Sequence, residues 1–357
     1  MKKILYGTTA LVAVGAFAAT GAQAAEPIQV TVGGYFQAAF VFVDYDNDDG
    51  RRSRTLQREA ELIFGGSTTL DNGLQVGVQV QLEAETCADQ IDESFIYLAG
   101  NWGRLNIGSE NSAAYLMHVA SAPPSHWAFG LNSPNISLTG NFPHTSPVSL
   151  TSDAEKVTYF TPRFAGFQLG ASYAPDACEE GGCGGTFSGS EFDDGSDGSV
   201  GDVIEIGVNY TGKWNEIEFA ASGSYGTADD ESTGDGPEEW SAGVRVGYAG
   251  FTIGAGYREF DSVIGDETTD WNVGVRYATG PWGVGIQYAA IEIDPNNGNR
   301  SDVQAVEVGG SYDLGPGVVL FGGVQYWEGD YDSASARAGT IADDETWVGF
   351  IGTMFSF

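Results

Sequence analysis

The chain has 357 residues, and its 49 acidic against 15 basic side chains give it a formal charge of −34. This charge argues against nucleic acid as a partner, because binding phosphates needs a basic surface. Glycine, with 52 residues, is about twice as frequent as average, while 42% hydrophobic and 12% aromatic residues exclude a disordered acidic tail. This composition favours an all-β protein.

The first 24 residues have the pattern of a secretory signal peptide. Lys2 and Lys3 precede an apolar run that ends at Ala19, and the small residues at 22–24 supply a cleavage site. Beyond this segment no run approaches the roughly 18 apolar residues that a membrane helix needs. We therefore expect a signal peptide over 1–24 and a mature chain over 25–357 that leaves the cytoplasm without a helical anchor.

Alternation with period two is the strongest pattern in the mature chain. Over 74–85, apolar side chains alternate with Gln, Gly and Glu, and the same pattern returns over 216–225 and 240–248. Seven short links alternate with eight longer ones, which predicts sixteen strands with tight periplasmic turns and longer extracellular loops. The short links are expected at 71–73, 100–102, 165–166, 211–215, 249–250, 278–281 and 313–317, and the longer ones at 45–53, 86–90, 110–154, 174–202, 226–238, 259–270, 291–302 and 328–345.

Aromatic residues mark the ends of the expected strands. From the seventh strand onwards each strand ends in an aromatic residue on its apolar face, from Tyr173 to Phe357, and several also begin with one, such as Trp240. Such rings suit the two interfaces of a lipid bilayer, while the polar face suits a water-filled lumen. A sheet in lipid must close, and sixteen strands leave an aqueous channel. The sequence therefore predicts a transmembrane antiparallel β-barrel of 16 strands in a bacterial outer membrane.

Two segments and the C-terminal residue form recognisable motifs. The segments are SFIYLAGNWGRLNIGSE, ending at Glu110, and KVTYFTPRFAGFQLGASY at 156–173, and Phe357 resembles an outer-membrane assembly signal. Together these motifs resemble those of Gram-negative general porins, and most closely those of the alphaproteobacterial type. The resemblance implies a homotrimer in contact with outer-membrane lipid and lipopolysaccharide. It also implies that the long third loop, about 110–154, folds into the lumen as a constriction loop.

The third loop departs from this family in its charge. Trp127-Ala128-Phe129-Gly130 resembles the Pro-Glu-Phe-Gly-Gly segment of enterobacterial porins, but Ala128 replaces the glutamate. Between Glu110 and Asp153 the loop has no acid, whereas the family usually opposes loop acids to wall arginines. The candidate pore-lining residues are Arg104, Arg245, Arg258, Arg276, Glu59, Glu61, Glu83, Glu110, Trp127 and Phe129.

The charges expected to face the lumen favour cations. Four arginines there could form the basic side of the narrowest part or could merely be solvated. The eight acids on the same parity outnumber them, and they are Glu59, Glu61, Glu83, Glu85, Glu205, Glu216, Glu218 and Glu307. We therefore expect a cation-preferring porin through which ions and small hydrophilic solutes diffuse passively.

The sequence patterns for a calcium site and for a disulfide are less specific. Asp44, Asp46 and Asp48 superficially resemble a calcium loop, and we expect no cofactor other than loop-bound calcium or magnesium. Cys178 and Cys183 could form a local disulfide, with Cys87 left over, or could be unpaired loop thiols.

A lipase and a structural or adhesive barrel are the two alternatives to a channel. A lipase would need His118, His126 or His144 as a base beside Ser125 or Ser146, but the Gly-x-Ser-x-Gly elbow is missing, so we expect no enzyme. The other alternative is a barrel with a mainly structural or adhesive role.

Overall fold

The computed structural model describes residues 27–45, 52–85, 91–133, 136, 138, 146–177, 200–230, 236–263, 265–296, 298, 300–330 and 345–357. The signal peptide, Cys87, Cys178, Cys183, His144, Asp46 and Asp48 lie outside these residues, so those expectations stay predictions.

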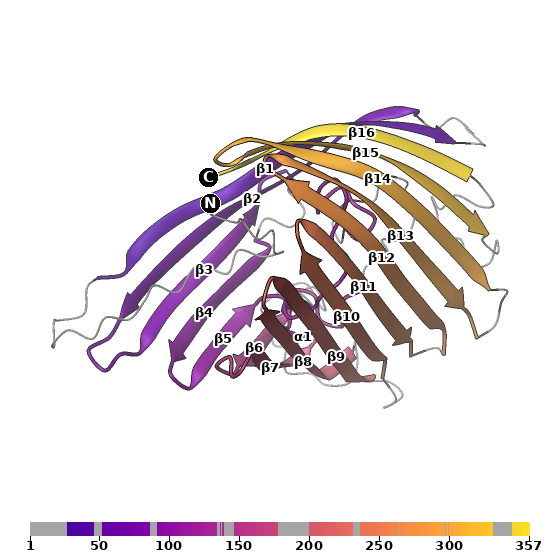
Figure 1. Ribbon diagram of the computed structural model, residues 1–357. Helices are drawn as coiled ribbons and strands as arrows, with labels where there is room; N and C mark the ends of the chain where they lie inside the picture. Colours follow the sequence, from indigo (N-terminus) through magenta and orange to yellow (C-terminus); the bar gives the residue numbers. More distant parts are fainter. Residues whose placement is uncertain are drawn as a thin grey trace.

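Sixteen strands and one short helix make up the described part of the chain (Figure 1). The strands are β1 (Gln29–Tyr45), β2 (Arg54–Thr69), β3 (Gln75–Glu83), β4 (Glu93–Gly100), β5 (Gly103–Ser109), β6 (Glu155–Phe160), β7 (Phe167–Asp176), β8 (Val200–Trp214), β9 (Ile217–Asp230), β10 (Glu238–Tyr248), β11 (Phe251–Asp261), β12 (Glu267–Thr279), β13 (Trp282–Asp294), β14 (Ser301–Gly315), β15 (Val318–Asp330) and β16 (Glu345–Ser356). The helix α1 (Ala113–Leu116) lies between β5 and β6.

The strands form one closed antiparallel barrel in which each strand pairs with its neighbours in the sequence and β1 pairs with β16. The strand count and the barrel class are as the alternation predicted. At the seam, the backbone N–H of Gly34 donates to the carbonyl of Phe357, and the N–H of Phe357 donates back, both at 3.1 Å. Closure gives every strand two partners, which removes the sheet edges.

Two-residue turns join several strands. Ala249 and Gly250, between β10 and β11, both have positive φ, at 50° and 89°, and Ala165 and Gly166 have 49° and 92°. Positive φ at both positions is what a tight hairpin turn of the favoured hand requires. The turns at 165–166 and 249–250 therefore lie where the sequence predicted short links, whereas β8 continues to Trp214 through most of the link predicted at 211–215.

The two faces of the wall differ in chemistry. Outward-facing side chains are apolar and exposed, such as Val244 at 47% and Ile351 at 64%, whereas the alternate positions are polar. Rings of neighbouring strands pair on the outward face, and the pairs are Phe167–Tyr210, Trp240–Tyr257, Phe251–Tyr277, Trp271–Tyr288, Trp282–Tyr312 and Tyr326–Trp347. Among the described residues, no helix has the length and hydropathy to cross a membrane.

Candidate functional site

Helix α1 begins the part of the third loop that packs against the polar face of the wall. Ser112 caps the helix by accepting from the N–H of Tyr115 at 3.3 Å, and the N–H of Ala113 donates to Ser172 Oγ on β7 at 2.8 Å. Ala113 and Ala114 are fully buried, because small side chains let the helix approach β7, β8 and β9 closely.

Residues 117–129, here called the strip, follow the helix and run along the polar face from β8 to β15. The strip has no strand partner of its own, so wall side chains satisfy its backbone groups. Asn209 on β8 donates to Met117 O (3.3 Å), Ser222 on β9 accepts from Val119 N (2.8 Å), and Gln325 on β15 donates to Phe129 O (2.9 Å).

The middle of the strip has anchors on the intervening strands. Asn272 Oδ1 on β12 accepts from the N–H and the hydroxyl of Ser121 at 3.1 and 2.6 Å, and Gln287 on β13 donates to that hydroxyl at 2.7 Å. On β14, the buried carboxylate of Glu307 accepts from Ser125 Oγ at 2.5 Å. Side chains of successive strands thus take up successive polar groups of the strip.

The length of the strip fits this path. Seven strand spacings separate β8 from β15, about 34 Å at ~4.8 Å each. The 12 residue steps from Met117 to Phe129 span about 40 Å when extended, at roughly 3.3 Å per residue. The strip therefore has enough length to follow the wall mostly as extended chain, with bends at 124–125 and a turn at 127–129 near its end.

All four arginines that the sequence places on the lumen side are engaged by protein atoms. Arg245 on β10 donates from Nε and Nη2 to Ala120 O at 2.9 and 2.6 Å. Arg276 on β12 donates to Pro124 O at 2.7 Å and to Pro123 O at 3.2 Å. Both guanidinium groups thus face the backbone of the strip.

Arg258 on β11 is held by two buried carboxylates. It pairs with Glu239 on β10, and its Nη1 lies 3.1 Å from Asp270 Oδ2 on β12. Glu239 also accepts from the N–H of Ser149, in the returning part of the loop, at 2.9 Å. Arg104 differs, because its guanidinium lies 4.0 Å from the ring centre of Tyr97 and its Nε donates to Asn106 at 2.7 Å.

Lys156 joins the two ends of the third loop, and the sequence reasoning did not single it out. Its buried ammonium group donates to the carbonyls of Glu110, Ser152 (2.9 Å) and Ala154 (2.6 Å). A lysine on the lumen parity next to a long loop was the available signal, but its partners are backbone carbonyls, which a sequence pattern does not reveal.

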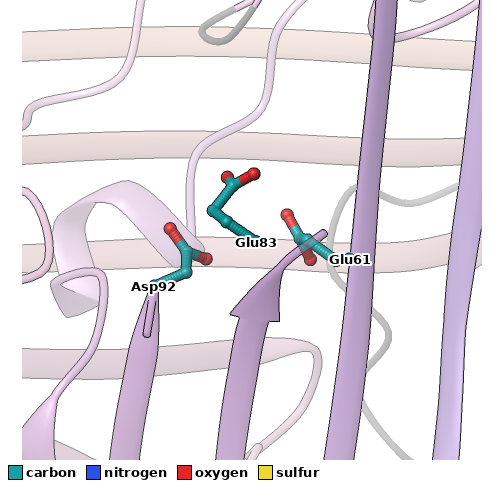
Figure 2. Close-up of side chains that lie close together, drawn as sticks. All are labelled: Glu61, Glu83 and Asp92. Carbon is teal, nitrogen blue, oxygen red and sulfur yellow. The ribbon is translucent and has the colours of Figure 1, made fainter. Parts of the chain in front are cut away.

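Carboxylates gather on the polar face of β2 to β4. Glu61, Glu83 and Asp92 lie close together, and one carboxylate oxygen from each of the three residues lies within 4.8 Å of those of the other two (Figure 2). Glu61 and Glu83 are directly opposite each other on β2 and β3. The hydroxyl of Tyr35 on β1 donates to Glu61 at 2.6 Å and contacts Glu59 at 3.0 Å. Asp92 was not among the predicted site residues.

Several residues predicted to line the pore are buried. Glu59 and Glu110 are 2% exposed and Phe129 is 0% exposed, so their side chains do not border open water. Glu59 is bonded by Gln37 at 2.9 Å, and Phe129 packs on rings of the wall. Trp127 is only half-buried and meets the ring of Tyr35 edge-on at 5.4 Å.

A serine and a histidine of the third loop do meet. His118 Nε2 lies 2.9 Å from Ser146 Oγ, and Asn272 Nδ2 donates to the same hydroxyl at 3.0 Å. Burial, with a smaller effect of nearby Arg245, lowers the pKa of His118 to about 3. Ser125 is bonded to a glutamate of the wall instead of a histidine, as described above.

The comparisons with known proteins agree with this fold. A family model described as Gram-negative porin matches residues 7–333. Among curated proteins, none shows significant sequence similarity to the chain.

Solved structures with a similar fold come from several bacteria. An anion-selective porin from Comamonas acidovorans has a TM-score of 0.65 and 16% identity, covering 93% of this chain and 100% of its own. A loop deletion mutant of OmpT, an outer membrane protein of Vibrio cholerae, has a TM-score of 0.63 and 14% identity, and the match covers 93% of this chain and 100% of that one. A triple mutant of the Rh. blastica porin has a TM-score of 0.58 and 15% identity, and the match covers 92% of this chain and 100% of that one. At these identities the likeness shows the fold alone, and the alphaproteobacterial subtype stays a prediction.

Proposed function

Since the chain belongs to the Gram-negative porin family and is an outer-membrane channel, we propose that it passes ions and small hydrophilic solutes by passive diffusion and prefers cations. The observation that carries the preference is the distribution of charge on the polar face. Arg245, Arg258 and Arg276 are turned to the strip or to buried acids, whereas Glu61, Glu83 and Asp92 cluster on β2 to β4. A wall section with one sign of charge concentrates counter-ions.

We propose that the third loop narrows this channel. The hydrogen bonds of the strip described above go to β8–β15, which leaves the polar face of β2 to β4 as the section next to the solute. We propose that solutes pass between this acidic section and the strip. Trp127, near Tyr35, would border the passage at the end of the strip.

We also propose a homotrimer in the outer membrane. Apart from Trp102 and Tyr159, which stack beside the β4–β5 turn, the ring pairs of the outward face lie on β7 to β16, where rings suit contact with lipid and lipopolysaccharide. On β3 to β5 the outward side chains include exposed aliphatic ones such as Ile96 (52%) and Ile107 (43%), which suit contact with other copies. Replacing both by Asn should dissociate the oligomer in mild detergent, whereas Ile253→Asn on β11 should not. Unchanged mass in the double variant would refute this interface.

We infer that the Ser146–His118 pair is structural and that the channel needs no cofactor. A general base must reach a substrate, but Ser146 is 1% exposed and both of its partners belong to the packing of the loop. Hydrolysis of a lipid ester by the purified protein that is lost in Ser146→Ala would refute this inference.

Reversal potentials in planar bilayers under a salt gradient test the cation preference. In dilute salt the wild type should favour cations, and the variant with Glu61→Gln, Glu83→Gln and Asp92→Asn should favour them less. Glu238→Gln and Glu267→Gln, on the exposed outward side, are the matched control and should change little. Anion preference of the wild type would refute the proposal, and the lack of any conductance would favour a structural or adhesive role.

A further inference from the structure

Glycines of the wall lie where the third loop passes. On the polar face of β7 to β14, a Cβ atom added to these glycines would meet loop atoms at 3.2 Å or less. They are Gly170, Gly207, Gly243, Gly254, Gly256, Gly274, Gly285 and Gly309, here called the glycine track. The track follows the same strands that hydrogen-bond to helix α1 and the strip, so it marks a groove without side chains in which the loop lies.

The strip lies closest to the glycine track on β10. A Cβ on Gly243 would stand 1.5 Å from the carbonyl oxygen of Val119, well inside the 3.0 Å below which something must shift. On β14, a Cβ on Gly309 would stand 2.7 Å from Ser125 Cβ. By contrast, Gly247, on the same polar face of β10, would make only ordinary contacts at 3.5 Å or more. The absence of side chains therefore matters at the strip and not everywhere along the strand.

Two arginines hold the strip beside the track. The carbonyls of Ala120, Pro123 and Pro124 have no strand partner, and the prolines offer no N–H for one. Arg245 supplies two donors to Ala120 O, and Arg276 supplies one N–H group that reaches both proline carbonyls. Arg276 Nη2 also donates to Ser311 Oγ on β14 at 2.8 Å, which fixes the direction of the guanidinium.

We propose that Arg245 and Arg276 are positioning residues that hold the strip in the glycine track and so set the width of the channel, rather than charges that act on the solute. This inference rests on the proposed channel function. It replaces the reading of these arginines as the basic side of the narrowest part. A strip released from the wall moves in the lumen, which makes the current fluctuate, whereas loss of a charge next to the solute changes ion selectivity.

The experiment compares three variants in planar bilayers after each has shown the wild type's mobility in unheated gels. Arg245→Met removes both donors and keeps the length of the side chain. Gly243→Ala keeps the arginine but makes the Val119 carbonyl retreat by about 1.5 Å (3.0 − 1.5), or the strand shift. Gly247→Ala is the matched control on the same strand and face.

Arg245→Met should increase the current noise and admit larger polyethylene glycols, with an unchanged reversal potential. Gly243→Ala should lower the single-channel conductance, again with the reversal potential unchanged, and Gly247→Ala should match the wild type. A shifted reversal potential without added noise in Arg245→Met would overturn the proposal, as would a wild-type conductance in Gly243→Ala.

Protease sensitivity of the strip in the folded barrel is a readout that does not depend on conduction. Cleavage within 117–129 should be faster in Arg245→Met and in Arg276→Met than in the wild type. If the wild type does not conduct, the proposed function fails while this readout still decides the positioning role. Equal cleavage rates in all variants would overturn the positioning role.

Discussion

Replacing Arg258 by methionine should destabilise the barrel strongly, because two buried carboxylates would lose their counter-charge. Glu239 and Asp270 are 0% and 1% exposed at the side chain, and Arg258 itself is 19% exposed. At the 3.1 Å between Arg258 Nη1 and Asp270 Oδ2, the attraction is about 5 kcal/mol for an effective dielectric constant of ~20. Removing one partner of a buried pair typically costs about 3–5 kcal/mol, and we expect a loss of that order.

Urea unfolding of the protein in lipid vesicles, followed by gel mobility without heating, measures this loss. Lys213→Met is the control, since the Lys213–Glu218 pair has a similar distance of 3.0 Å but is 52% and 44% exposed. Exposed pairs contribute less than about 1 kcal/mol. Adding Glu239→Gln and Asp270→Asn to Arg258→Met should recover most of the stability, because no charge then stays buried. An equal loss in Arg258→Met and Lys213→Met would refute the reasoning.

Three further outcomes are expected. Neutralising Glu61, Glu83 and Asp92 together should reduce cation preference clearly in dilute salt and little at 1 M, where the Debye length is about 3 Å; an equal effect at both concentrations, measured by reversal potential, would contradict screening. Lys156→Met should speed proteolysis of the third loop in the folded barrel, because three carbonyls lose their donor; an unchanged rate would contradict this role. Burial lowers the pKa of His118 to about 3. The stability that the neutral His118 side chain contributes is therefore fully present above pH 6.5. It is lost at about 1.4 kcal/mol per pH unit as the pH falls toward 3. The destabilisation caused by His118→Gln should therefore shrink over that range in urea titrations, and a constant difference would contradict it.

The wall of the barrel could be predicted from local patterns. A strand that separates lipid from water must alternate, so the period-two pattern around 74–85 and 240–248 located strands without any knowledge of their neighbours. The links also carry local signals, as at Ala249-Gly250, where the tight turn has positive φ at both residues.

The partners of the charged residues could be predicted only in part. Arg258 and Asp270 are directly opposite each other on β11 and β12, so the register of one hairpin is sufficient to pair them. Glu239 joins them from β10, and its bond to Ser149 depends on where the loop returns. Arg245 and Arg276 bond to the strip, but the alternation of the sequence does not distinguish a guanidinium group in water from one bonded to a loop.

The sequence by itself determined the strand order and which side of each strand is polar, because these depend on neighbours within a few residues. Only the tertiary structure decided the path of the strip, because 117–129 has no periodicity and its backbone groups are satisfied by side chains far away in the chain. Ala120 meets Arg245 and Phe129 meets Gln325 across 125 and 196 residues. Such contacts depend on the closed barrel, which places β8 to β15 around the loop, and the glycine track shows how closely the wall fits it.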